Sequence, residues 1–272
     1  MTEQSPTLSN KMANVDEESQ TPTPSPRPEK RSLSDFLNEE VEHNNSTIPL
    51  AWQSFLTGFI DLILYSRSQV WVGFQTGNMV QFSGNIAQYM LPDYIREPLL
   101  TLERVISICA FFLGSFMSAR LANYFGGRTR KSLFISSVIQ SCFLWGASAI
   151  LLTRPEDELP TFRYFPAVLA LAAWSMGMQS GASQKLTSPA FATTVAFTAT
   201  LSQIASDPNI FKLRSAARDT RMIGIVSLCI GAGVGEMFLY AKTNLRGGLA
   251  VVAGFKLLQA FMWFLPKASQ PK

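Results

Sequence analysis

The chain has 272 residues, of which 47% are hydrophobic and 15% are charged. Soluble domains carry roughly 25% charged residues, so this composition excludes an ordinary soluble domain and predicts an integral protein of the lipid bilayer. The net charge of +4 is modest and argues against a nucleic-acid partner. The only histidine, His43, lies in a polar tail, so we expect no metal site, no cofactor and no enzyme.

Three regions are expected along the chain. Residues 1–47 form a polar tail that bears too little apolar surface to offset the entropy of ordering, which predicts disorder. Within this tail, residues 33–43 have the pattern of a short amphipathic helix. Residues 48–266 are expected to form a helical transmembrane domain, and residues 267–272 a short polar C-terminal tail.

Six stretches reach the ~20 apolar residues that a spanning helix needs. They lie at roughly 48–67, 104–123, 132–153, 162–184, 221–241 and 248–265. Two further segments, roughly 70–90 and 189–206, are apolar but rich in Gln, Asn, Ser and Thr. Backbone of that kind is tolerated in a membrane only inside protein or beside a wet cavity. We therefore expect an all-α polytopic protein with about six transmembrane helices and two short re-entrant or broken helices.

Charge favours the six-span path. Cytoplasmic loops collect Lys and Arg, and basic residues gather at about 120–131 and 207–221. With six spans, both basic loops and both termini are cytoplasmic, whereas eight spans separate the loops. A seven-span path also stays open. The plasma membrane and the vacuolar membrane both fit, and the sequence specifies no oligomeric state.

The two halves of the membrane region resemble each other weakly. Each half has a spanning helix, a Thr-rich weak segment and two further spans, which predicts a two-fold internal repeat. Residues 76–79 correspond to 198–201, and 58–61 to 177–180. Three spans per half give the halves opposite orientations, a plan that is common among secondary transporters.

Asp61 is the first candidate site residue. A carboxylate within a span costs roughly 2.5–3.5 kcal/mol, so we expect it to face the protein interior. It could bind a proton, a cation or a substrate, or hold a neighbouring helix. If Gly77 interrupts the helix, the amides that follow would favour an anion. The candidate substrate-binding set is Asp61, Gln75, Thr76, Gly77, Asn78, Thr194, Thr198 and Thr200, with helix packing as the alternative role.

Glu236 and Lys256 are the second candidate. Counted from the loop between the last two spans, they lie at similar depths, so an intramembrane ion pair is predicted. The pair would be structural, or it would form a charge relay or a substrate site.

The motifs GFIDLILY, FQTGNMVQFSGNIA, GMQSGASQK and TTVAFTATLSQIA resemble those of the DUF1275 membrane family, also called the YoaK family. The resemblance covers about residues 48–266, and the Thr-Pro-rich tail is similar to fungal members. Ala199 stands where the family usually has a glycine. The resemblance implies a multi-pass helical architecture and specifies no substrate.

These observations predict a transporter or permease-like protein for a small polar or anionic metabolite, moved with or without a proton. The alternative is a non-transporting membrane protein that binds partners or lipids as a scaffold.

Overall fold

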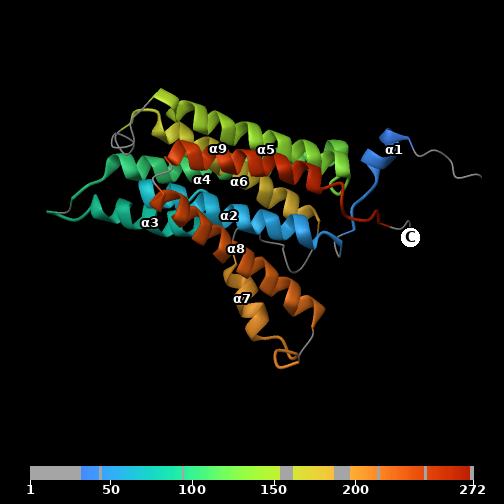
Figure 1. Cartoon of the computed structure of the whole chain (residues 1–272). Helices are drawn as coiled ribbons and strands as arrows, with labels where there is room; N and C mark the ends of the chain where they lie inside the picture. The colour runs from blue at the N-terminus through green and yellow to red at the C-terminus, as the bar shows by residue number, and fades with distance from the viewer. Residues whose placement is uncertain are drawn as a thin grey trace, which may run out of the picture. The chain divides into compact units, whose positions relative to one another are not determined.

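The computed structural model describes residues 32–42, 45–93, 95–153, 162–186, 197–212, 215–241 and 244–269. In this part of the chain there are nine α-helices and no strand, apart from two isolated backbone bridges. The helices are α1 (Leu33–Asn38), α2 (Thr47–Ser68), α3 (Gln75–Gln88), α4 (Pro98–Phe125), α5 (Arg130–Ile150), α6 (Phe165–Lys185), α7 (Thr198–Ala205), α8 (Ala216–Tyr240) and α9 (Leu245–Met262) (Figure 1). The predicted all-α class is confirmed.

The six long helices coincide with the six predicted stretches. Five of them, α2, α4, α5, α8 and α9, are long and apolar enough to cross a membrane, so the chain is an integral membrane protein. The sixth, α6, has 21 residues but carries Gln179, Ser183 and Gln184 in its second half. Most of α6 is buried among other helices, and a helix that is shielded from lipid needs less apolar surface.

The long helices alternate in direction along the chain. Ser141 donates to the Ala253 carbonyl at 2.7 Å, and Ser148, farther along α5, donates at 2.9 Å to Arg246, which comes earlier in α9. These two helices are therefore antiparallel, as Figure 1 shows. Contacts of the same kind make α2 antiparallel to α6 and to α9. Helix α2 is parallel to α8, and α4 is parallel to α6.

This path agrees with six crossings and gives the two halves opposite orientations. The weak segments appear as α3, with 14 residues, and α7, with 8 residues. The long helices before and after α3 run in opposite directions, and so do those before and after α7. A full crossing by α3 or α7 would instead make its two neighbours parallel. Residues 187–196, the start of the second weak segment, lie outside the described residues.

Helices α4 and α6 cross at two glycines. A Cβ atom built on Gly114 would lie 2.1 Å from the carbonyl oxygen of Trp174, and one built on Gly177 would lie 2.0 Å from that of Phe111. Each glycine thus faces the residue one turn before the glycine of the other helix. Small residues at membrane helix interfaces let backbones approach closely in this way.

Helices α2 and α8 cross in the same manner. Here Gly58 faces the carbonyl of Leu228 at 2.0 Å, and Gly231 faces that of Phe55 at 1.9 Å, measured again from the added Cβ. In the predicted repeat, α2 of the first half corresponds to α6 of the second half, and α4 corresponds to α8. The crossing of α2 with α8 is therefore the equivalent of the crossing of α6 with α4. The crossings therefore support the predicted repeat, including the correspondence of Gly58 with Gly177.

The compact part of the chain begins earlier than expected. Leu33–Lys272 form one unit, whereas the sequence suggested a boundary at residues 47 and 48. Val41 is buried, its amide donates to the Arg128 carbonyl at 2.9 Å, and its backbone bridges to Ala268. Residues before and after the membrane helices thus meet at one end of the unit, beside the loop that joins α4 to α5.

Candidate functional site

Asp61 holds the break between α2 and α3. Helix α2 ends where Gln69 adopts a left-handed conformation, with a φ angle of 58°. Five residues then lead into α3, and the Asp61 Oδ1 atom accepts hydrogen bonds from the amides of Val72 at 3.0 Å and Gly73 at 2.7 Å. The carboxylate therefore satisfies two backbone amides of the connection between α2 and α3.

Asn78 fixes the same connection from the other side. Its side chain accepts a hydrogen bond from the Trp71 amide at 3.0 Å and donates to the Trp71 carbonyl at 2.6 Å. Ser107 of α4 also donates to that carbonyl, at 2.7 Å. Gln75 donates to Ser107 at 3.1 Å and to the Val72 carbonyl at 2.8 Å. Gln75 and Asn78 thus fasten the start of α3 to α4.

The remaining residues of the TGN motif have different environments. Gly77 lies inside α3, so the helix does not break there, and the conditional anion site at that position is not formed. A Cβ atom on Gly77 would lie 2.9 Å from ring atoms of Trp71 and Phe74, so the glycine makes room for aromatic packing. Thr76 is exposed and lies outside the polar network.

A cavity of about 330 Å³ adjoins Asp61, and we call it the Asp61 cavity. Its lining residues are Gly58, Asp61, Leu62, Trp71, Phe74, Phe197, Thr198, Leu201, Leu228 and Ala232. Two predicted site residues, Asp61 and Thr198, are therefore brought to one cavity. Thr200 is buried but is not among the lining residues, and Thr194 lies outside the described residues.

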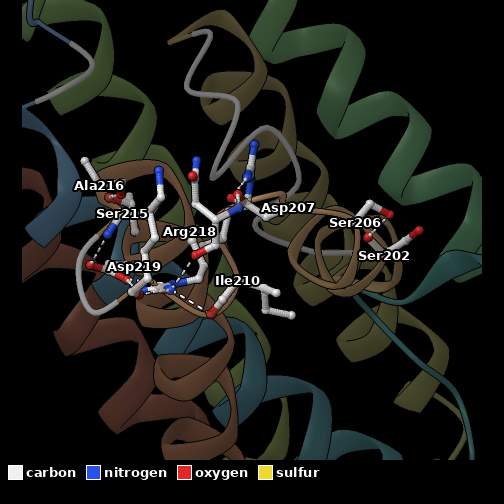
Figure 2. Close-up of polar contacts among 12 residues, drawn as sticks. Ser202, Ser206, Asp207, Ile210, Ser215, Ala216, Arg218 and Asp219 are labelled. Carbon is white, nitrogen blue, oxygen red and sulfur yellow. Dashed lines mark hydrogen bonds and ion pairs between the residues drawn. The ribbon is translucent and has the colours of Figure 1, made fainter.

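The link between α7 and α8 ties the short helix to its neighbour (Figure 2). Arg218 folds back over this link, donating to the Ile210 carbonyl at 2.9 Å and pairing with the Asp219 carboxylate at 2.7 Å. Arg221 lies 3.6 Å from the Asp207 carboxylate. These contacts fasten the link that follows α7 to the start of α8, and α7 supplies one wall of the Asp61 cavity.

Lys256 lies at a second polar centre and is fully buried. Its ammonium nitrogen donates to the side-chain oxygens of Gln140 at 2.8 Å, Gln259 at 3.2 Å and Gln179. Glu236 is exposed on α8 and forms no ion pair with Lys256. The predicted ion pair is therefore wrong, because the lysine points into the bundle while the glutamate points out of it.

The glutamines connect Lys256 to α2. Gln179 donates to the Thr57 hydroxyl at 2.8 Å and to the Gln53 carbonyl at 3.2 Å, and Ser183 donates to the Gln53 side chain at 3.0 Å. We call Lys256 and its three glutamine partners the Lys256 cluster. An ammonium group has three N–H donors, so the three amide oxygens match a charged lysine one for one.

The polar partners of Lys256 were not predicted from the sequence. Gln140 and Gln259 lie within apolar runs, and a polar residue there is expected to have a partner. That rule could have identified Gln140 and Gln259 as residues with a partner, but it would not have identified Lys256 as the partner that they share. Among the described residues, no group of three or more His, Cys, Asp or Glu side chains is arranged to hold a metal ion.

A known protein family matches nearly the whole membrane region of this sequence. The sequence model of a family described as "Protein of unknown function (DUF1275)" matches residues 50–262. The chain belongs to the DUF1275 family. Searches of curated proteins and of solved structures returned no match. In this DUF1275 member the motifs that carry the resemblance lie where the structure has its polar features. GFIDLILY contains Asp61, and GMQSGASQK contains Gln179.

Proposed function

We propose that this protein is a transporter or permease-like protein for a small polar or anionic metabolite, and not an enzyme. One observation carries the proposal. The Asp61 cavity is lined by α2 and the link after it, from the first half, and by α7 and α8, from the second half. Transporters built from inverted repeats bind their substrates at the interface between the repeats, where helices are interrupted.

The chemistry of the lining favours the polar alternative over the anionic one. Among the described residues that line the cavity, Asp61 is the only ionisable one, and Thr198 supplies a hydroxyl. A carboxylate repels an anionic solute unless a proton accompanies it. An anion would therefore be moved together with a proton on Asp61, whereas a neutral polar solute could bind to the charged carboxylate directly.

We also infer that the end bearing both termini faces the cytoplasm. The described residues nearest the two termini meet at this end, beside the basic loop between α4 and α5. The second basic segment, between α7 and α8, lies at the same end, because α8 begins where α2 begins. Loops rich in Lys and Arg are retained on the cytoplasmic side.

The variant Asp61→Asn separates the charge of Asp61 from its structural role. Asparagine keeps a side-chain oxygen that can accept the hydrogen bonds from Val72 and Gly73, so we expect the break between α2 and α3 to persist. The charge is lost, and with it the binding of a proton or of a polar solute. Thr76→Ala, at an exposed position of the same motif, is the matched control.

Untargeted metabolite profiling of a deletion strain tests the proposal without knowledge of the solute. Reintroducing the wild-type chain or Thr76→Ala should restore the metabolite profile, and Asp61→Asn at equal abundance should not. A scaffold predicts the opposite: Asp61→Asn would restore the profile, and removal of residues 1–31 would abolish it. The deletion stops at residue 31 because residues 33–42 pack on the helical unit.

A further inference from the structure

A second hollow, of about 610 Å³, lies between α3 and the start of α4. It lies at the end of the unit opposite the bridge between Val41 and Ala268, because α2 runs away from that end and α4 begins where α2 stops. Its polar lining comes from Gln81, Asn85 and Gln88 of α3, Asp93 and Glu97 of the connection, and Arg104 of α4. None of these residues lines the Asp61 cavity.

Arg104 is a buried cation whose electrostatic partners, Glu97 and Glu103, are too far away to form a salt bridge with it. Only 6% of this residue is exposed. One of its terminal nitrogens donates to the Asn85 side-chain oxygen, but its Nε atom is buried with no hydrogen-bond partner. Within the described residues, Arg104 forms no salt bridge. A buried donor without a partner is unfavourable, and a guanidinium group is well suited to grip a carboxylate.

The hollow also offers acceptors. The Gln81 Oε1 atom is buried without a partner, and the carboxylates of Asp93 and Glu97 are exposed at the rim. Asn85 donates to Gln88 at 3.2 Å, which orients both amides of α3. The hollow therefore presents one cation for an anionic group, and carboxylates and an amide oxygen for a cationic group.

We propose that this hollow binds a small zwitterion of the α-amino-acid type. The carboxylate of the ligand pairs with Arg104, and its ammonium group lies toward Glu97 and Gln81. Ile95 provides an apolar wall for the ligand's side chain. The site is separate from the Asp61 cavity, and binding to it does not depend on transport.

Four probes test the charge pattern on the purified full chain in detergent, by isothermal titration calorimetry. L-leucine carries both charges, 2-hydroxy-4-methylpentanoate only the carboxylate, and 3-methylbutan-1-amine only the ammonium. We expect L-leucine to bind about ten-fold or more tightly than either analogue, the factor that about 1.4 kcal/mol of extra interaction gives. O-phosphoethanolamine, which has the phosphate and ammonium groups of a lipid headgroup, is the fourth probe, and we expect it to bind more weakly than L-leucine.

Two variants assign the binding to the hollow. Arg104→Gln should weaken L-leucine binding about ten-fold or more, because a charge-assisted contact is lost. Gly84→Leu should also abolish binding, because a Cβ atom on Gly84 meets open space and the larger side chain fills the hollow without disturbing α3. Arg120→Gln, which removes an exposed arginine from the far end of the same helix, should leave binding unchanged.

Three results would overturn the inference: binding of the hydroxy acid as tight as that of L-leucine, undiminished binding by both variants in the hollow, or no binding of any probe. Stronger binding of O-phosphoethanolamine would assign the hollow to a lipid headgroup and overturn it as well. Because no vesicles are used, the outcome is independent of the transport proposal. A chain that binds L-leucine but moves no solute would contradict only the latter.

Discussion

Lys256 and Arg104 are both buried cations whose nearest side-chain partners are amides, yet their surroundings differ. Lys256 has three ammonium hydrogens and three glutamine oxygens that accept them. Arg104 donates to Asn85, but its Nε atom has no partner, and a hollow lies beside it. Burial of a charge therefore does not by itself mark a binding site. A cation with matched donors holds helices together, whereas one with an unmatched donor and free space is ready for a ligand.

Replacing the matched cation gives the largest expected effect. Lys256→Met leaves three buried amide oxygens without a donor, and each such acceptor costs ~1–3 kcal/mol. We expect the free energy of unfolding to fall by about 3 kcal/mol or more, measured as a loss of thermal stability in detergent. Leu257→Met, at the neighbouring and exposed position of α9, is the control. A variant as stable as wild type would show that the Lys256 cluster does not hold the bundle together.

Removing one amide oxygen near each of the two cations tests whether a matched acceptor contributes more to stability than an unmatched one. Gln140→Leu takes a partner from Lys256 and should destabilise the protein by ~1–3 kcal/mol. Gln81→Leu removes a buried oxygen that has no partner, so it should leave the stability unchanged or raise it, by up to ~1–3 kcal/mol. Both variants are compared by thermal unfolding under the same conditions. Equal destabilisation would contradict the distinction between a matched and an unmatched site.

The smallest effect is expected at a third cation, in the link between α7 and α8. Arg221 lies 3.6 Å from Asp207, a long separation for an ion pair. Glutamine can still donate a hydrogen bond to Asp207, so Arg221→Gln should cost only ~0.5–1.5 kcal/mol, too little to alter global unfolding by much. Hydrogen exchange should nevertheless quicken in the amides of α7, with those of α9 unchanged. Uniform quickening would mean that the pair stabilises the whole unit.

Much of the helical architecture could be predicted from the sequence. The length of an apolar run decides whether a segment can span a bilayer, and the positions of the long helices follow from that rule. The two weak segments could also be recognised, because polar side chains within an apolar run need partners inside the protein. The correspondence of Gly58 with Gly177 could be recognised in the sequence. The structure explains it, because each glycine lies where its helix crosses a helix of the other half.

The site could be predicted only in part. Asp61 and Thr198 reach the same cavity, and Gln75 and Asn78 lie next to it, but in a structural role. Depth along the helices suggested that Glu236 and Lys256 would pair, whereas the rotation of α8 turns the glutamate outward. Arg104 was overlooked because it lies near the start of a span, where an arginine is ordinarily solvated. Which face of a helix points inward is decided by packing between helices, and depth alone does not reveal it.

Solute uptake by proteoliposomes shows whether the Asp61 cavity is a transport site. Purified chain is reconstituted at equal density as wild type, Asp61→Asn or Thr76→Ala, and the entry of the labelled metabolites that accumulate in or disappear from the deletion strain is followed. We expect the wild type and Thr76→Ala to take up at least one of them, and Asp61→Asn to do so about ten-fold more slowly or not at all. Equal uptake by Asp61→Asn and the wild type, or no uptake by any form, would contradict transport through the Asp61 cavity.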